Sequence, residues 1–142
     1  MTTSKKKALR VLSFILVLVS CLSLTTPLAL AEGSLYISHY SVSMSAGSGG
    51  NVTAWFQITG TGNMDQIGAI LVYIYENGTQ VKTFSSSTTS GMMAYNTNFH
   101  GSSVTYKGTV GKSYSALVVF QAGKDGDWDN RSMSTNSVTA KN

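Results

Sequence analysis

The sequence predicts an all-β protein in which about seven antiparallel strands form a single sandwich. Three observations lead to this prediction. The stretch 104–122 contains a strand, a turn at 109–111 and a second strand in which apolar residues keep strict period two from Tyr114 onward. The most hydrophobic segment, 67–76, also alternates and runs into Asn77-Gly78, the strongest short hairpin signal. No segment shows helical periodicity over the roughly eleven residues that a helix prediction needs.

Tyr114 has the placement of a tyrosine corner, because it begins a strand directly after a tight turn. In such a corner the ring fills the end of a sandwich core. Its hydroxyl bonds to the backbone a few residues upstream. We therefore expect Tyr114 to be buried and to fix which side of its strand faces the core.

The first 31 residues have the features of a secretory signal peptide. Four basic residues among the first ten precede an apolar run over 11–24, and Ala29-Leu30-Ala31 supplies a small-residue cleavage site. The apolar run is too short, and too soon followed by Pro27, for a membrane span of about 20 residues. We expect residues 1–31 to be removed and residues 32–142 to form one secreted β-sandwich domain.

A second processing route remains open at Cys21. Leu18-Val19-Ser20-Cys21 has the shape of a bacterial lipobox, in which cleavage before the cysteine and acylation of its sulfur would anchor the domain as a lipoprotein. Cys21 is the only cysteine of the chain, so the mature domain would contain no disulfide. A domain of this length buries enough surface to fold without one.

The charge of the mature chain differs from that of the precursor. Four of the ten Lys and Arg residues lie before residue 11, and all six Asp and Glu residues follow residue 31. The mature chain therefore carries six charges of each sign and no net charge. Nucleic acids and anionic membranes attract clustered basic charge, so the sequence predicts neither as a partner.

Three segments precede the central hairpin. Residues 34–45 alternate in two phases, which indicates a bulge, and residues 51–59 alternate as a half-buried strand. Residues 60–66 read as a polar loop.

Three further segments lie outside the hairpin and the opening stretch. Residues 85–101 begin as a low-complexity loop, and their apolar residues predict a short edge strand near 92–95. Residues 123–131 read as an acidic loop and residues 132–140 as a final polar strand.

A two-residue loop at Asn77-Gly78 would fix the register of the hairpin by counting. Glu76 would then oppose Thr79. The remaining pairs of this register are Ile74 with Val81, Tyr73 with Lys82, Val72 with Thr83, and Leu71 with Phe84.

The count and spacing of the strands are those of an immunoglobulin-like sandwich. Over 68–84 and 111–140 the chain resembles fibronectin type III domains, through the alternation into Asn77-Gly78, the corner Tyr114 with Ala116 and Val118, and the closing Thr135-Asn136-Ser137-Val138. The resemblance implies the same all-β architecture.

The mature chain also resembles an uncharacterised family of small secreted proteins of Gram-positive bacteria. The matching motifs are Gly62-Asn63-Met64 with Ile67-Gly68-Ala69, Val104-x-Tyr106-x-Gly108, and Gly111-x-x-Tyr114-x-Ala116. This resemblance implies secretion and fold but no activity.

The predicted binding site is the outer face of the central sheet. If Val72, Ile74 and the Tyr114 series point into the core, period two sends the neighbouring side chains outward. These form an exposed apolar surface of the kind that marks contact sites, and its members are Leu71, Tyr73, Tyr75, Phe84 and Leu117. In the alternative, Met92, Met93 and Phe99 fold back and cover this face as a second small core.

A calcium site is the second site hypothesis. Asp125, Asp127 and Asp129 occupy positions 1, 3 and 5 of a loop that resembles the start of an EF-hand. Asn130 and Asn136 stand where that loop has Gly and a bidentate Glu. A solvated acidic hairpin explains the same residues, so both interpretations remain open.

No motif predicts catalysis. Gly111-Lys112-Ser113 resembles the end of a phosphate-binding loop, but Tyr106 stands where the motif needs Gly, and a strand follows in place of a helix. His39 and His100 are the only histidines, too few for a structural zinc site without cysteine.

Two tryptophans offer contact surfaces. Trp55 and Trp128 are amphipathic rings suited to carbohydrate or partner contacts. A ring tucked under a loop is the other interpretation of Trp55.

The predicted function is that of a secreted, non-enzymatic binding module that contacts an extracellular protein or a glycan. A self-associating structural or matrix protein is the alternative, suggested by the low charge and the aromatic outer face. A lipid-anchored surface protein processed at Cys21 is the second alternative. Apart from the calcium hypothesis, no cofactor is predicted.

Overall fold

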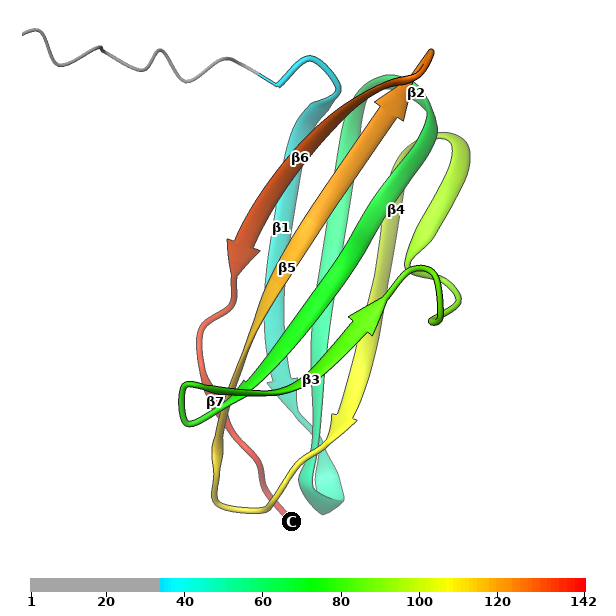
Figure 1. Cartoon of the computed structure of the whole chain (residues 1–142). Helices are drawn as coiled ribbons and strands as arrows, with labels where there is room; N and C mark the ends of the chain where they lie inside the picture. Colours follow the sequence, from blue (N-terminus) through cyan, green and yellow to red (C-terminus); the bar gives the residue numbers. More distant parts are fainter. Residues whose placement is uncertain (1–33) are drawn as a thin grey trace, which may run out of the picture. The chain divides into compact units, whose positions relative to one another are not determined.

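Strand β2 (Asn51–Glu76) is the longest strand and pairs with four others. The computed structural model describes residues 34–142, so the predicted signal peptide, its cleavage site and Cys21 lie outside the described residues. The other strands, all in Figure 1, are β1 (Ile37–Ala46), β3 (Thr79–Ser85), β4 (Met93–Lys107), β5 (Ser113–Lys124), β6 (Asp127–Ser134) and β7 (Val138–Thr139).

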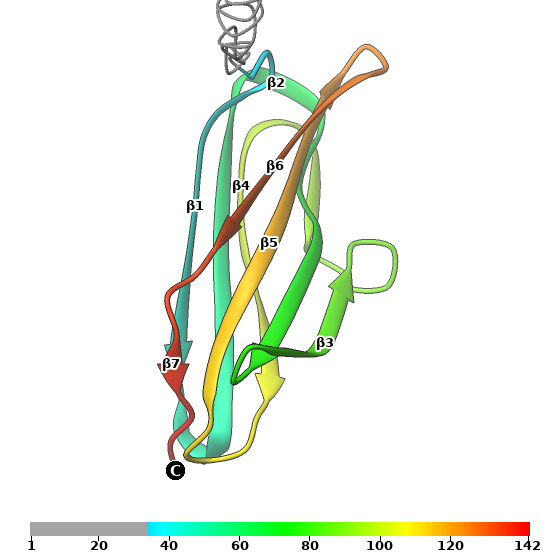
Figure 2. The same cartoon turned by 60° about the vertical axis from the view of Figure 1, so that its left-hand side comes forward.

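The prediction of an all-β fold is confirmed. The seven strands form one curled antiparallel sheet, and residues 34–142 contain no α-helix, only the short 3₁₀ turn η1 (Ser48–Gly50). Strand β2 pairs with β1 up to Gly60 and with β4 up to Gly68, and its second half pairs with β3 and β5. Strand β6 continues the sheet beyond β5, and β7 pairs with the start of β5. Figures 1 and 2 show the two parts of the sheet facing one another across the curl.

The core lies between these two parts of the sheet. Alternate residues of β2 and β5 fill it, as the period-two pattern predicts. Across the core, the Phe56 ring of β2 meets the Phe120 ring of β5 edge-on, with centroids 6.4 Å apart. The Tyr40 ring of β1 lies 5.4 Å from the same Phe120 ring. Both the 51–59 strand and the Tyr114 strand therefore have the predicted buried sides.

The predicted tyrosine corner is confirmed. Tyr114 is 1% exposed, and its hydroxyl accepts a hydrogen bond from the backbone N–H of Thr109 at 2.8 Å. The same hydroxyl donates to a carboxylate oxygen of Glu76 at the end of β2. Gly108 makes room for the ring, because a Cβ atom there would lie 2.6 Å from Tyr114 Cζ. Burial and the Glu76 hydrogen bond raise the pKa of Tyr114, so the hydroxyl keeps the proton that it donates.

The polar loop predicted at 60–66 is wrong, because β2 runs through this segment without a break. Met64 turns inward and is 2% exposed, while its polar neighbours face the solvent. Thr61 bonds to the chain before β1, through its N–H to the Tyr36 carbonyl at 3.0 Å and its Oγ1 to the Leu35 carbonyl at 2.8 Å. These contacts and a register shift between Thr59 and Met64 allow one strand to bend between the two parts of the sheet.

The short edge strand predicted near 92–95 is part of a longer one. Strand β4 begins at Met93 and continues to Lys107, so it also contains the segment at 104–107 that is predicted from the sequence to form a separate strand. Met92, just before it, is 1% exposed and belongs to the core. Turns connect β3 to β4, and Figure 2 shows them projecting from the edge of the sheet.

The hairpin turn is confirmed, but most of its predicted register is wrong. Asn77 and Gly78 both have positive φ, 47° and 84°, as a type I′ turn requires, and Glu76 opposes Thr79. A bulge at Val81 then shifts the pairing by one residue. Phe84 consequently opposes Val72 in place of Leu71, and it packs against the core.

The acidic loop predicted over 123–131 is also wrong. Only Asp125-Gly126 forms the turn, with φ values of 54° and 87°, and β6 begins directly afterwards at Asp127. The predicted final strand is divided between the end of β6 and the two residues of β7. The two-residue Asp-Gly turn is a strong hairpin signal in its own right.

Candidate functional site

The predicted outer face is partly assembled by the structure. Tyr73 opposes Leu117 and Leu71 opposes Val119, so these side chains share one side of the β2–β5 pair. With Tyr75 they are half-buried. Phe84 is not part of this face, because the bulge at Val81 turns it to the core side.

The cover proposed for that face does not form. Met92 lies in the core, and Phe99 opposes Thr59 on the other part of the sheet. Met93 alone lies nearby, over Gly68, where its sulfur would be 2.9 Å from an added Cβ atom. The half-buried state of Tyr73 and Tyr75 therefore does not come from Met92 or Phe99.

Trp128 lies over a glycine. It opposes Gly123 across the β5–β6 hairpin, and a Cβ atom on Gly123 would lie 2.0 Å from Trp128 Cε3. The ring thus occupies the space that the missing side chain leaves, a known way of stabilising glycine in a sheet. This packing explains Trp128 as a structural residue.

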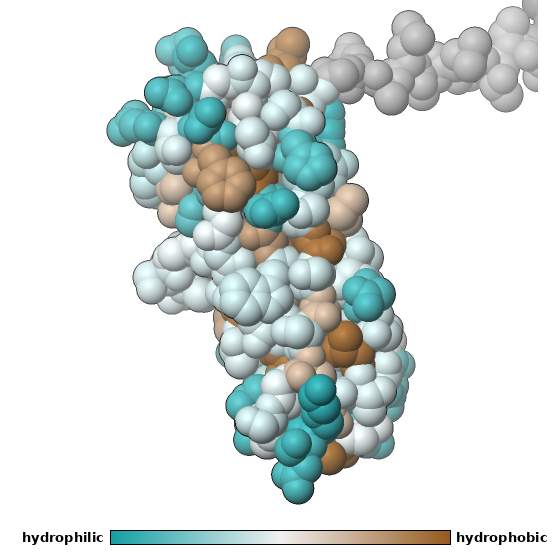
Figure 3. All heavy atoms as spheres, turned by 180° about the vertical axis from the view of Figure 1, so that it is seen from behind, coloured by the Kyte–Doolittle hydropathy of each residue, from teal (hydrophilic) through white to brown (hydrophobic). Residues whose placement is uncertain are grey.

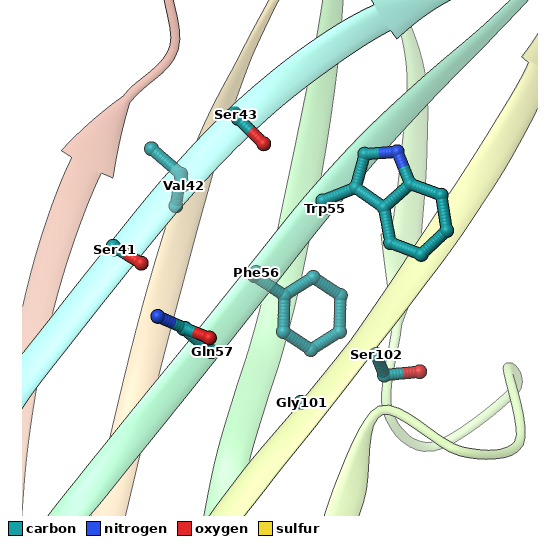
Figure 4. Close-up of a pocket in the computed structure, with 8 residues that line it drawn as sticks. All are labelled: Ser41, Val42, Ser43, Trp55, Phe56, Gln57, Gly101 and Ser102. Atoms are coloured by element: carbon teal, nitrogen blue, oxygen red, sulfur yellow. The ribbon is translucent and has the colours of Figure 1, made fainter.

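Trp55 stands on the outer side of β2 beside a groove. The ring is 52% exposed, and its Nε1–H donates to Ser45 Oγ at 3.1 Å, so no loop covers it. The groove has a volume of about 330 Å³, and Figure 4 shows its lining drawn from β1, β2 and β4. The eight lining residues are Ser41, Val42, Ser43, Trp55, Phe56, Gln57, Gly101 and Ser102.

The register places the groove in an array of side chains on one face. Residues directly opposite each other in an antiparallel sheet point to the same side. The pairings give four rows of side chains, and each row contains one residue from β1, one from β2 and one from β4. We call these twelve residues the groove face. The rows are Ser45, Thr53 and Thr105; Ser43, Trp55 and Ser103; Ser41, Gln57 and Gly101; and His39, Thr59 and Phe99.

Phe99 provides a second exposed ring on the groove face. It is 50% exposed, and its ring lies back over Gly101, where an added Cβ atom would be 3.3 Å from Phe99 Cζ. Gly101 in turn opposes Gln57 at the centre of the groove. The ring of Phe99 therefore extends toward Trp55 and is held by its contact with the glycine.

The groove face carries hydroxyl, amide and aromatic groups and the exposed imidazole of His39, and it has no acid, Lys or Arg. Thr53 Oγ1 and Thr105 Oγ1 bond to each other at 2.9 Å in the first row. Lys107 lies beyond that row, where its ammonium group bonds to the Gly49 carbonyl. In the space-filling view from behind (Figure 3), weakly polar residues dominate and strongly hydrophilic ones lie mainly toward the two ends.

The three aspartates of the calcium hypothesis do not converge. Among residues 34–142 no group of three or more His, Cys, Asp or Glu side chains is arranged to hold a metal ion. Asp129 instead accepts hydrogen bonds from Ser34 Oγ at 2.6 Å and from the backbone N–H of Tyr36 at 2.8 Å. These bonds lower the pKa of Asp129 and tie the start of the described chain to β6.

The residues considered for catalysis lie apart. His39 is exposed in the last row of the groove face, whereas His100 Nε2 bonds to the Gly91 carbonyl at 2.8 Å and its ring stands 6.4 Å from that of Phe56. Gly111-Lys112-Ser113 leads from a turn into β5, as the strand pattern predicts, and no helix follows it.

The sequence predicts Trp55 as a contact residue but does not predict the rest of the groove. The alternation of Thr53, Trp55, Gln57 and Thr59 marks one side of a strand. It does not reveal that Phe99 and Gly101 lie on the next strand. That neighbour follows from the pairing of β2 with β4, which in these rows connects residues 40 or more positions apart.

Comparisons with protein-family models, with curated proteins and with solved structures found no match. Among the described residues, no helix has the length and apolar character needed to span a membrane.

Proposed function

We propose that this chain is a secreted, non-enzymatic binding module and that its ligand binds on the groove face. One observation carries the proposal: two half-exposed rings share this face, of which Trp55 lines the groove and bonds to Ser45, while Phe99 packs on Gly101, which also lines it. Aromatic rings supply large contact areas and are enriched where proteins bind partners. Side chains held before binding also lose less conformational entropy on binding.

Secretion is proposed from the N-terminal pattern. Basic residues, an apolar run and Ala29-Leu30-Ala31 support removal of residues 1–31 and release of the domain. Processing at Cys21 would instead leave a lipid-anchored surface protein. Both routes put the groove face outside the cell.

The immunoglobulin-like sandwich is proposed as the architecture. Seven antiparallel strands, the curl of the sheet around one core, and the Tyr114 corner support this assignment. Such sandwiches are common recognition scaffolds, although function depends on the site and not on the fold.

The chemistry of the groove supports binding over catalysis. Its polar side chains are serines and Gln57, and its lining contains no histidine or carboxylate to serve as a general base. An unactivated serine hydroxyl is a weak nucleophile.

Binding to isolated Gram-positive cell walls tests the proposed function. Protein recovered from cells that express the full chain should sediment with the walls, and Trp55→Ala or Phe99→Ala should weaken this binding. Tyr95→Ala is the matched control, because Tyr95 is an exposed aromatic residue of β4 outside the four rows. Equal loss in all three variants, or no sedimentation of the unmodified protein, would refute the proposal.

Self-association is the second candidate function, favoured by the half-buried row of Leu71, Tyr73, Tyr75 and Leu117. Size-exclusion chromatography with light scattering distinguishes it from the first. A strict monomer at high concentration rules it out. An apparent molar mass that rises with protein concentration would support self-association, provided that the double variant Tyr73→Ser with Tyr75→Ser abolishes the rise.

A further inference from the structure

We infer that the ligand of the groove face is an uncharged, extended polysaccharide. This inference rests on the proposed function, since it specifies what the groove face binds. Three independent features of the face carry it: the placement of its rings, its unpaired polar groups, and its lack of charge.

The two rings suit stacking against sugar rings. A sugar presents a C–H face that packs on an aromatic face, while its hydroxyls stay free to form hydrogen bonds. Trp55 and Phe99 stand on neighbouring strands, four residues apart along the register, so their Cα atoms are roughly 14 Å apart by sheet geometry. The Phe99 ring lies back over Gly101 toward Trp55, so the rings are closer than the Cα atoms, and a ligand that touches both must span the row between them.

Polar groups without protein partners lie beside the rings, Gln57 in the row between Trp55 and Phe99 and Ser41 and Ser43 on the neighbouring strand β1. Ser41, Ser43 and Gln57 line the groove, and within residues 34–142 their side chains make no hydrogen bond. By contrast, the Thr53 and Thr105 hydroxyls satisfy each other at 2.9 Å outside the groove. Ser41, Ser43 and Gln57 thus offer two hydroxyls and one amide, which both donate and accept, as sugar hydroxyls do.

The lack of acidic, Lys and Arg side chains on the groove face disfavours charged ligands. An acidic polysaccharide or a nucleic acid would find no Lys or Arg within the four rows, and a basic one would find no carboxylate. Protein interfaces typically have Arg among their anchoring residues. A neutral sugar chain needs neither, because its recognition depends on stacking and hydrogen bonds.

Sedimentation with purified insoluble polysaccharides tests the inference. The probes are cellulose and chitin as neutral chains, and calcium-free alginate beads as an acidic chain, each mixed with protein recovered from cells expressing the full chain. We expect binding to at least one neutral probe. The amount bound should be the same at low salt and at about 0.5 M NaCl, a concentration that screens interactions between surface charges. Trp55→Ala and Phe99→Ala should each weaken it by about tenfold or more.

Two further variants keep the result independent of folding. Gln57→Ala removes an exposed amide without touching either ring, so it should weaken binding at an unchanged melting temperature. Tyr95→Ala should bind as the unmodified protein does. The melting temperature of every variant is measured alongside.

The outcomes separate this inference from the proposed function. Suppose that the protein binds cell walls, that protease treatment of the walls abolishes this binding, and that neither neutral polysaccharide is bound. That result overturns the inference and leaves a module that binds proteins. Salt-sensitive binding to alginate alone also overturns it. No binding to walls or to polysaccharide overturns both.

Discussion

The Tyr114 hydroxyl and the backbone N–H of Thr109 are joined by a 2.8 Å hydrogen bond that closes the turn before β5. The same oxygen donates to Glu76 at the end of β2, so a single side chain links the turn, the start of β5 and the central strand. The ring of Tyr106 in β4 lies 6.0 Å from that of Tyr114 and completes this end of the core. The corner therefore fixes which side of β5 is buried.

Removing this hydroxyl should destabilise the fold. Tyr114→Phe leaves the Thr109 N–H and the Glu76 carboxylate without their partner, and we expect a loss of about 1–3 kcal/mol in the free energy of unfolding. Urea denaturation followed by circular dichroism measures it. Tyr106→Phe is the control, since Tyr106 is only half-buried. If the two variants lose the same stability, the corner does not have the role described.

The Trp128–Gly123 contact predicts a steric clash. Gly123→Ala places a methyl group where the indole now lies, 2.0 Å from Cε3, so the ring must move and stability should fall by about 1–3 kcal/mol. Thermal denaturation with tryptophan fluorescence should show both effects. Gly62→Ala is the matched control, because a Cβ atom there meets nothing within 4 Å. Similar melting temperatures for both variants would contradict the contact.

Because of the bulge at Val81, truncating Phe84 and truncating Val81 on the same short strand should affect stability very differently. Phe84 packs against the core and Val81 is exposed, so Phe84→Ala should cost about 1–3 kcal/mol and Val81→Ala less than about 0.5 kcal/mol. Without the bulge, Val81 would oppose Ile74 and face the core with it. If Val81→Ala loses more stability than Phe84→Ala, the bulge is absent and the register without it is correct.

Asp129 predicts a pH dependence of stability. Hydrogen bonds from Ser34 Oγ and the Tyr36 N–H lower its pKa in the folded protein below the ordinary value of 3.8. Its contribution is therefore complete above the unfolded-state pKa and is lost as the pH falls through the lower folded-state value. Urea denaturation across this acidic range should show the loss.

The variant Asp129→Asn tests the assignment of that pH dependence. It cannot ionise, so its stability should fall less steeply at acidic pH than that of the unmodified protein. Asp127→Asn is the comparison on the same strand. A pH profile that Asp129→Asn leaves unchanged would assign the effect to another carboxylate.

Short-range chemistry accounts for what the sequence predicts correctly. Asn77-Gly78 adopts positive φ because these residues tolerate it, and the alternation from Tyr114 onward directly encodes a buried side. The bulge at Val81 has no such local signal, since no glycine or proline marks it, and it moves Phe84 to the core. One shifted residue therefore changes the membership of the predicted site.

The groove face depends on pairing between distant segments. Strands β1 and β4 lie on either side of Trp55 because both pair with the first part of β2, and the part of β4 that pairs there comes from a segment 40 or more residues further along the chain. Hydroxyl-rich strands look alike in a sequence whether they face solvent or a ligand. Only the register shows that Trp55, Gln57 and Phe99 share one face.

Fluorescence of Trp55 tests the central claim most directly. The chain has two tryptophans, so Trp128→Phe leaves Trp55 as the single reporter, and Trp55→Phe leaves Trp128 as the control. Titration with a soluble form of whichever neutral polysaccharide sediments the protein should change the emission of Trp55 in a saturable manner and leave that of Trp128 unchanged. Saturable binding with no change at Trp55 would contradict the assignment of the groove face as the binding site.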